Sequence, residues 1–285
     1  MIDIRSKENG DILYSVDSDT LMHADFRSAN LRNADLSGLD LRHADFSMAI
    51  LIGADLSNSQ LQFADFSGAK MSDTNLLGAD LSRALFSSGR ATGAADMSHA
   101  NLSQSVMLAA NLDFVNLQHS NFKDADLSYA SFKSADLSSS DFSEADLCEA
   151  SFNNANLSNC NLSDTDLCGA HFNNADLSNS NLDRAELSGE KTQQPAIFTM
   201  AILENSSLVG TNMEGVILKK ANLSQTDMRK ANLSNAVLNG AFIRNANVED
   251  ADFSGVALGT VSMQFSNFSK AKNADIPAHK KANLR

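Results

Sequence analysis

Apolar side chains recur along this chain with a period of five residues. From Ala24 the sequence reads ADFRS, ANLRN, ADLSG, LDLRH and ADFSM, so four of these five units begin with alanine, and each has, two positions after its first residue, a Leu or Phe that we call the centre. An α-helix repeats every ~3.6 residues and a simple strand every ~2, so neither accounts for this spacing. The pattern predicts that each unit turns a corner, with the alanine and the centre pointing inward and the other three residues outward.

A second period, of twenty residues, indicates how many corners make up one turn of the coil. Phenylalanine centres recur every twenty residues, at Phe26, Phe46, Phe66 and Phe86 and again at Phe132, Phe152 and Phe172. Twenty residues are four units, so one turn of the coil has four sides, and each Phe is expected to stack on the Phe one turn away at the ~4.8 Å spacing of adjacent strands. Units that cannot bury their own centres must stack on their neighbours, as in a solenoid.

Units such as ADLSN, ANLSN and ADLCE resemble those of the pentapeptide-repeat family. The resemblance covers residues 20–270 and implies an all-β fold, a right-handed quadrilateral parallel β-helix. At twenty residues a turn, we expect about twelve turns.

The two ends of the chain depart from the repeat. Apolar and polar residues alternate on both sides of Asn9-Gly10, which predicts that residues 1–19 form an N-terminal β-hairpin cap over the first turn. Residues 271–285 abandon the centres and are expected to form a C-terminal cap or a loose tail.

The charge of the chain limits its partners. A net charge of -13 argues against direct binding to nucleic acid, whose phosphates need Lys and Arg, but suits proteins with basic clefts. Residues 207–285 hold 10 Lys and Arg against 6 Asp and Glu, a net charge of +4, which leaves -17 for the rest. No apolar run approaches the ~18 residues of a membrane span, and the N-terminus does not resemble a signal peptide, so we expect no membrane contact and a cytoplasmic protein.

The five-residue period breaks twice, at SSGRATGA (87–94) and GEKTQQPA (189–196), where consecutive centres lie eleven residues apart. Eleven is two units plus one residue, so each break is either a bulge that the coil absorbs or a projecting recognition loop. If each break replaces one side, both fall on the same side. Quinolone-resistance members of the family carry two loops that matter for topoisomerase protection; the breaks here resemble them in number but are shorter. The candidate recognition residues are Arg90, Thr92, Lys191 and Gln193.

If the side of Phe26 is side one and each break counts as a side, side one carries a stripe of carboxylates at the outward position before the centre, interrupted in the middle by Leu85 and Val106: Asp25, Asp45, Asp65, Asp126, Asp146, Asp166 and Glu186. A carboxylate every ~5 Å resembles, in rough scale, the ~3.4 Å phosphate spacing of a DNA strand, which suggests DNA mimicry. The alternative is that Asp or Asn is the repeat consensus here, because a short polar side chain satisfies the turn backbone. Like charges this close also predict raised pKa values.

Apolar residues occupy the same outward position in the C-terminal third: Ile197, Ile217 and Val237 on one side, and Ile202 and Phe242 on the adjacent side. Stacked, exposed apolar residues predict a contact surface for a partner or for self-association as a homodimer. The alternative is scattered surface residues without consequence.

The sequence shows no catalytic constellation, so we expect no enzyme, no cofactor and no metal site. Cys148 and Cys168 are twenty residues apart and therefore neighbours on adjacent turns, within disulfide range. Parallel side chains and a reducing cytoplasm favour free thiols. The outward His23 and His43 also stack, and we interpret them as surface histidines.

Together these features favour a non-catalytic protein–protein interaction scaffold, a rigid acidic rod that docks a partner protein. The alternative is a DNA-mimicking ligand of a type II topoisomerase, DNA gyrase or topoisomerase IV, that gives protection from quinolones or other poisons.

Overall fold

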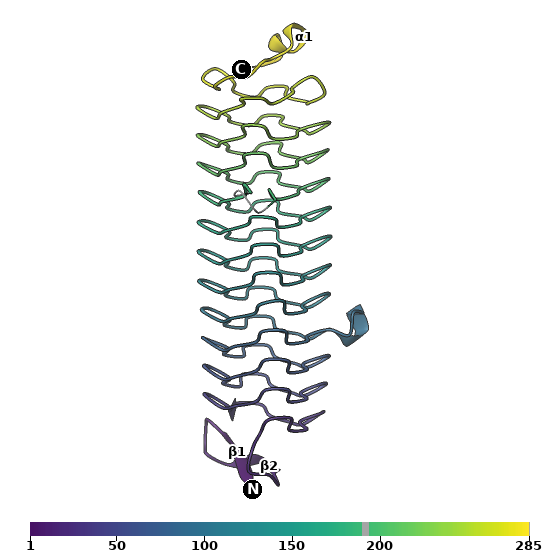
Figure 1. The fold of residues 1–285 in the computed structure, drawn as a ribbon, viewed down its shortest axis with the longest axis vertical. Helices are drawn as coiled ribbons and strands as arrows, with labels where there is room; N and C mark the ends of the chain where they lie inside the picture. The colour runs from purple at the N-terminus through teal and green to yellow at the C-terminus, as the bar shows by residue number, and fades with distance from the viewer. Residues whose placement is uncertain (190–193, 285) are drawn as a thin grey trace. The chain divides into compact units, whose positions relative to one another are not determined.

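The computed structural model describes residues 1–189 and 194–284, which fall into two compact units, Met1–Phe142 and Ser143–Arg285. In both units the chain winds with four sides per turn (Figure 1). Residues before the centre form parallel bridges to the residue twenty positions later, and the four sides of one turn supply four of them: Asp25 to Asp45, Asn30 to Ile50, Asp35 to Asp55 and Asp40 to Gln60. The quadrilateral β-helix expected from the sequence is confirmed; the number of turns stays a prediction.

Each corner is a tight turn between a centre and the next alanine. The amide of Ala24 donates to the carbonyl of Leu21 at 3.0 Å, and His23 between them has φ of 60°. A positive φ at the third residue is typical of a type II turn and favours Gly, Asn and Asp. The next two residues run straight and bond to the following turn, where the amide of Phe26 donates to Asp45 at 2.8 Å. A turn plus a short bridging segment takes five residues, which explains the period.

The core is a narrow column of centres and alanines. The rings of Phe26, Phe46, Phe66 and Phe86 are fully buried and stack with centroids 4.8, 5.0 and 5.1 Å apart. Some inward alanines are replaced by serines, and these hydroxyls are satisfied by carbonyls of the coil: Ser120 donates to Met97 at 2.9 Å. The expected stacking of equivalent side chains is therefore confirmed in this column.

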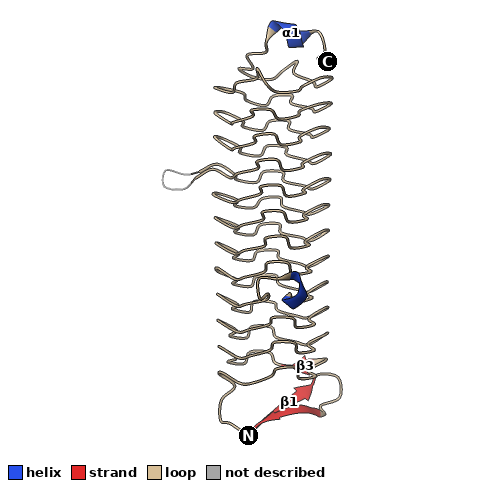
Figure 2. Cartoon of the chain, turned by 90° about the vertical axis from the view of Figure 1, so that its right-hand side faces the viewer, coloured by secondary structure: helices blue, strands red, loops and turns tan. Residues whose placement is uncertain are grey.

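A hairpin covers the start of the first unit. Strands β1 (Ile2–Ser6) and β2 (Ile12–Val16) pair antiparallel, and β1 also pairs with β3 (Ala34–Asp35), giving the order β2-β1-β3 (Figures 1 and 2). Tyr14 packs on the first core ring, Phe26, at 5.5 Å and donates its hydroxyl to the carbonyl of Asp25. The hairpin thus covers the first stacked ring, as expected from the alternation around Asn9-Gly10.

The C-terminal segment closes the second unit. Helix α1 (Ala278–Lys281) carries Lys280, whose ammonium donates to the carbonyls of Leu258, Gly259 and Val261 at 2.7 to 2.9 Å (Figure 2). A further bond joins the amide of Phe265 to the carbonyl of Asn283. These bonds satisfy carbonyls near the end of the coil and hold the segment against it, which favours the cap, although that assignment stays a prediction.

The first break projects from the coil as a loop. It contains the short 3-10 helix η1 (Ala91–Gly93), and Ser87 pairs with Ala94 at its neck (Figure 1). Below the neck, the amide of Ala95 donates to the carbonyl of Phe86 at 2.8 Å, so the loop replaces the usual tight turn.

The break adds residues without replacing a side of the coil. Leu85 bridges to Asn111, 26 residues later, where the regular offset is 20, so six residues are inserted between two consecutive sides. The second break has the equivalent backbone bond at its base: the amide of Ala196 donates to Leu187 at 2.9 Å, and His171 bridges to Ile197, again 26 residues later. The expectation that each break takes the place of one side is therefore wrong.

Candidate interaction surfaces

The predicted acidic stripe is not one column. Asp25, Asp45 and Asp65 are bridged in series, but the series continues to Leu85. Asp126 belongs to the adjacent side, after Asp80 and Val106. The sequence-based assignment failed here because it counted the six inserted residues as part of a side.

In the second unit, three members of the predicted stripe do lie together. Asp146, Asp166 and Glu186 are bridged in series, followed by Asn212. Each unit therefore carries its own short row of three carboxylates on successive turns.

Most of these carboxylates satisfy the backbone of their own turn. Oδ1 of Asp45 accepts from the amide of Ser47 at 2.9 Å, and Oδ1 of Asp65 accepts from Ser67 at 2.8 Å. The same bond joins Asp126 to Ser128. This is the local role that short polar side chains play at turns, and it accounts for Asp and Asn before the centre without any partner.

Arginine lowers the negative charge at one end of the first row. The guanidinium of Arg27 donates to both oxygens of Asp25, at 2.6 and 2.9 Å, and its Nε lies 3.7 Å from Asp45. These side-chain hydrogen bonds, helped by the Arg27 amide, lower the pKa of Asp25 to about 2. The expectation of a raised pKa is wrong at this position, because an adjacent cation outweighs repulsion between the carboxylates.

The candidate recognition residues of the first break lie in the projecting loop. Arg90 precedes η1 and Thr92 is within it, and both are exposed. Lys191 and Gln193 of the second break lie outside the described residues.

The second unit carries the predicted apolar residues on two adjacent sides. Ile197, Ile217 and Val237 are bridged in series and half-buried. Ile202 and Phe242 share a series too, but Asn222 lies between them, so they are not direct neighbours as the sequence had suggested.

A methionine at the corner joins these two sides. Met200 follows Ile197 and precedes Ile202, and its side chain is 53% exposed, compared with 41% for Ile202 and 37% for Phe242. Sequence reasoning missed it, because the outward turn position accepts almost any residue. We call the six residues Ile197, Met200, Ile202, Ile217, Val237 and Phe242 the apolar surface. Arg244 lies over the ring of Phe242 at 5.2 Å and forms part of its polar edge.

Stacked rings line one exposed corner of the first unit. His23 stacks on His43 at 4.7 Å, as expected, and His43 stacks on Phe63 at 4.9 Å. The guanidinium of Arg83 continues the row, 5.8 Å from the Phe63 ring. Phe63 was not a sequence candidate, although its position twenty residues after His43 could have indicated it.

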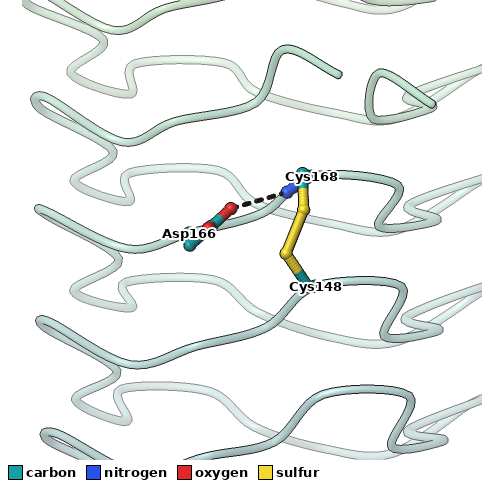
Figure 3. Close-up of side chains that lie close together, drawn as sticks. All are labelled: Cys148, Asp166 and Cys168. Atoms are coloured by element: carbon teal, nitrogen blue, oxygen red, sulfur yellow. Dashed lines mark hydrogen bonds between the residues drawn. A yellow bond between two sulfur atoms is a disulfide. The ribbon is translucent and has the colours of Figure 1, made fainter. Parts of the chain in front are cut away.

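Cys148 and Cys168 form a disulfide between successive turns of the second unit, with their Cα atoms 4.8 Å apart (Figure 3). The expectation of free thiols is therefore wrong for this structure: the coil brings the residues within bonding range, and the side chains turn toward each other. Asp166 lies beside them, and its Oδ1 accepts from the amide of Cys168 at 3.1 Å. The two sulfur atoms and a carboxylate oxygen of Asp166 all lie within 4.8 Å of one another.

Within residues 1–189 and 194–284, no helix has both the length and the apolar character needed to cross a membrane.

Comparison with protein families finds pentapeptide repeats, in eight copies, over residues 21–58, 49–87, 93–128, 125–164, 160–189, 196–235 and 217–255. A comparison with curated proteins finds no match.

Among solved structures, the chain is similar to HetL, a pentapeptide repeat protein involved in heterocyst differentiation regulation from the cyanobacterium Nostoc sp. strain PCC 7120. The two are 30% identical over 73% of this chain and 90% of HetL, with a TM-score of 0.47. Rfr23, a pentapeptide repeat protein from the cyanobacterium Cyanothece 51142, is 28% identical over 36% of this chain and 63% of its own, with a TM-score of 0.31. QnrB1, a plasmid-mediated fluoroquinolone resistance protein, is 20% identical over 75% of this chain and 85% of its own, with a TM-score of 0.29.

Proposed function

This chain belongs to the pentapeptide repeat family, and from that premise we propose that it is a non-catalytic interaction protein whose coil presents side chains to a protein partner. The observation that carries the proposal is the apolar surface of the second unit.

Two properties of the apolar surface favour a partner. Five of its six residues, all but Met200, stand directly before a centre, where the repeat otherwise places mostly Asp, Asn and Ser, and all six side chains are half-buried or exposed. Burying such area in an interface contributes about 25 cal/mol per Å². Arg244 and the exposed Lys219 and Lys220 lie close to the apolar residues in the coil, and an apolar centre with a charged edge is typical of protein interfaces.

The partner that we propose first is a second copy of this chain, giving a homodimer through the C-terminal third. Sedimentation of the full chain over a range of concentrations tests this. The wild type should associate as its concentration rises, and Ile217→Asp should remain monomeric, because a carboxylate would then be buried in an apolar contact.

Asn247→Asp is the matched control. Asn247 is also half-buried before a centre, but on another side, and its Oδ1 accepts from the amide of Glu249 and from Asn267, bonds that an aspartate keeps. This variant should associate like the wild type. A wild type that stays monomeric at every concentration would rule out the homodimer. If, in addition, all three proteins captured the same partners from a cell extract, the apolar surface would be excluded as the binding site, and if none captured any partner, the broader proposal would fail.

A second candidate function is binding to a type II topoisomerase, DNA gyrase or topoisomerase IV, as a mimic of DNA. The rows Asp25, Asp45 and Asp65 and Asp146, Asp166 and Glu186 favour it, because each places three carboxylates on successive turns. Two facts weigh against it: Arg27 pairs with Asp25, and the row of the first unit ends at Leu85.

A supercoiling assay with DNA gyrase and a relaxation assay with topoisomerase IV, each with and without a quinolone, separate the two functions. Topoisomerase binding predicts inhibition or protection that weakens in Asp45→Asn and Asp65→Asn, which keep the turn bond through the amide oxygen. No effect over a wide range of protein concentration would reject the second candidate and leave the first standing.

A further inference from the structure

We propose that, in the reduced protein, Cys148, Cys168 and Asp166 bind one thiophilic divalent cation, with Zn²⁺ as the expected ion. This site is separate from the apolar surface and does not depend on the proposed function.

The backbone holds the two cysteines at a fixed distance. The amide of Leu147 donates to Asp166 at 2.8 Å, and the amide of Glu149 donates to Cys168 at 2.8 Å, so bonds on both sides of Cys148 set the register. With Cα atoms 4.8 Å apart, a change of rotamer in the reduced protein moves the two sulfur atoms out of bonding distance while both cysteines stay on neighbouring turns. Zn–S bonds of ~2.3 Å in a tetrahedral site place two sulfur ligands about 3.8 Å apart, which is likewise outside bonding distance. Side-chain rotation alone therefore converts a disulfide geometry into a chelating one.

Asp166 supplies the third ligand. Its carboxylate oxygen already lies within 4.8 Å of both sulfur atoms, and the bond from the Cys168 amide to Oδ1 fixes its orientation (Figure 3). A carboxylate offers about four acceptor positions on two oxygens, and the bond from the Cys168 amide uses one of them. Cys148 and Cys168 are 9% and 2% exposed, whereas Asp166 is exposed, so the ion would approach from the solvent side and a water molecule would complete the site.

Nearby carboxylates make the position favourable for a cation. Asp146 is bridged to Asp166, and the Glu149 carboxylate lies against Gly169, where an added Cβ would come within 2.6 Å of it. Two thiolates and one carboxylate form a mixed sulfur and oxygen ligand set. That set suits Zn²⁺, whereas Mg²⁺ and Ca²⁺ prefer oxygen ligands alone.

Metal binding and the disulfide exclude each other. Reduction by a dithiol transfers two electrons and two protons to the S–S bond, which gives two thiols and an oxidised, cyclic disulfide of the reductant. Zn²⁺ then replaces the two thiol protons, which pass to the buffer. In a reducing compartment, which the sequence favours, the dithiol form is the relevant one.

Cobalt titration of the full chain tests the site. The protein is reduced with excess dithiol, freed of it by gel filtration without oxygen, and titrated with Co²⁺, whose absorption reports thiolate ligation. We expect one equivalent to bind with a thiolate-to-cobalt band, Zn²⁺ to displace it, and the oxidised protein to show no band.

Three variants assign the ligands. Cys148→Ser should lose the band, and it should fold because Ser234 occupies the equivalent turn position in the same unit. Asp166→Asn should weaken Zn²⁺ binding by about 10-fold or more. Cys160→Ser, at a buried inward position outside the cluster, should bind like the wild type.

Each contrary result would overturn the proposal. If the reduced wild type showed no thiolate-to-cobalt band, or if Cys148→Ser still showed one, Cys148 and Cys168 would not form a metal site. Loss of the band in Cys160→Ser would place the ion elsewhere, and unchanged affinity in Asp166→Asn would remove the carboxylate from the ligand set. Far-UV circular dichroism of each variant separates these results from a failure to fold.

Discussion

Removing the six residues 88–93 should leave a folded protein, because the first break is an insertion between two sides of the coil. The offset from Leu85 to Asn111 is 26 residues, and excision returns it to 20. The junction then reads Phe86, Ser, Ala, Ala, Asp, Met, which is one regular unit with Ala95 inward and Met97 as the next centre.

Two opposing contributions set the magnitude of the change. Closing a six-residue loop costs roughly 1.6 kcal/mol of chain entropy, from (3/2)RT ln n, and excision removes this cost. Ala94 now has φ of -86° but would become the third residue of a tight turn, where a positive φ costs a non-glycine residue about 1–2 kcal/mol. Ala109 already adopts φ of 55° at such a position. The free energy of unfolding should therefore change by less than about 1 kcal/mol.

Denaturant unfolding and amide exchange measure this. The amide of Met71, bonded to Asp96 at 2.6 Å, and that of Met97, bonded to Asn116 at 2.8 Å, should stay protected in the excised chain. Adding Ala94→Gly to the excised chain should recover about 1 kcal/mol, because glycine adopts a positive φ without strain. A loss of more than about 3 kcal/mol, or exchange at Met71 as fast as in a loop, would refute the reasoning and make the six residues part of the coil.

Three further predictions concern the core, one ion pair and the C-terminal cap. Phe46→Ala should lower the free energy of unfolding by about 3–5 kcal/mol, since the ring is fully buried between two others. Phe63→Ala, at a residue that is 49% exposed, should lower it by less than about 1 kcal/mol. Equal losses for the two variants in denaturant titrations would contradict the stacked core. Arg27→Gln should raise the pKa of Asp25 from about 2 toward its ordinary value near 3.9, measured by carboxyl NMR titration. A carboxyl group whose pKa is lowered in the folded state stabilises the fold at pH values above its unfolded pKa, and this stabilisation is lost as the pH falls toward 2. The variant should therefore lose less stability than the wild type between about pH 4 and pH 2. An unchanged pKa of Asp25 in the variant would exclude the ion pair as the cause of the lowered pKa. Lys280→Ala should speed amide exchange in the last turn of the second unit, because three carbonyls lose their donor; unaltered exchange would mean that the cap does not depend on this side chain.

The fold was predictable because every five-residue unit imposes the same steric requirement on the chain. An inward alanine and centre every five residues admit one kind of corner, and Phe26, Phe46 and Phe66 at twenty-residue spacing fix four corners to a turn. The hairpin was readable for a similar reason, since Asn9-Gly10 between alternating residues favours one turn type.

Contacts of outward side chains were less predictable. The turn position two residues after a centre holds Met200 and Phe63 at a positive φ that favours glycine and asparagine, so the turn pattern does not predict these outward apolar side chains. The chemistry of Cys148 and Cys168 depends on the rotamers of two side chains, which the spacing leaves open. The pKa of Asp25 depends on one neighbouring arginine, whereas the sequence argument considered only the row of carboxylates.

The position of the acidic rows shows why the spacing of the centres alone could not assign outward residues to the sides of the coil. A spacing of eleven residues between centres has two explanations that fit the sequence equally. It is either two five-residue units with one bulged residue, or one five-residue unit with a six-residue insertion. A single backbone bond decides between them: the amide of Ala95 donates to Phe86, which makes Met97 the very next centre. Every residue after the break then moves by one side, which separates Asp126 from Asp65 and places it in the series of Asp80 and Val106. In a solenoid, a surface row that continues past an insertion can therefore be assigned only when the register of the backbone bridges is known. The packing of the core does not decide the register, because the centres stack equally well under either count.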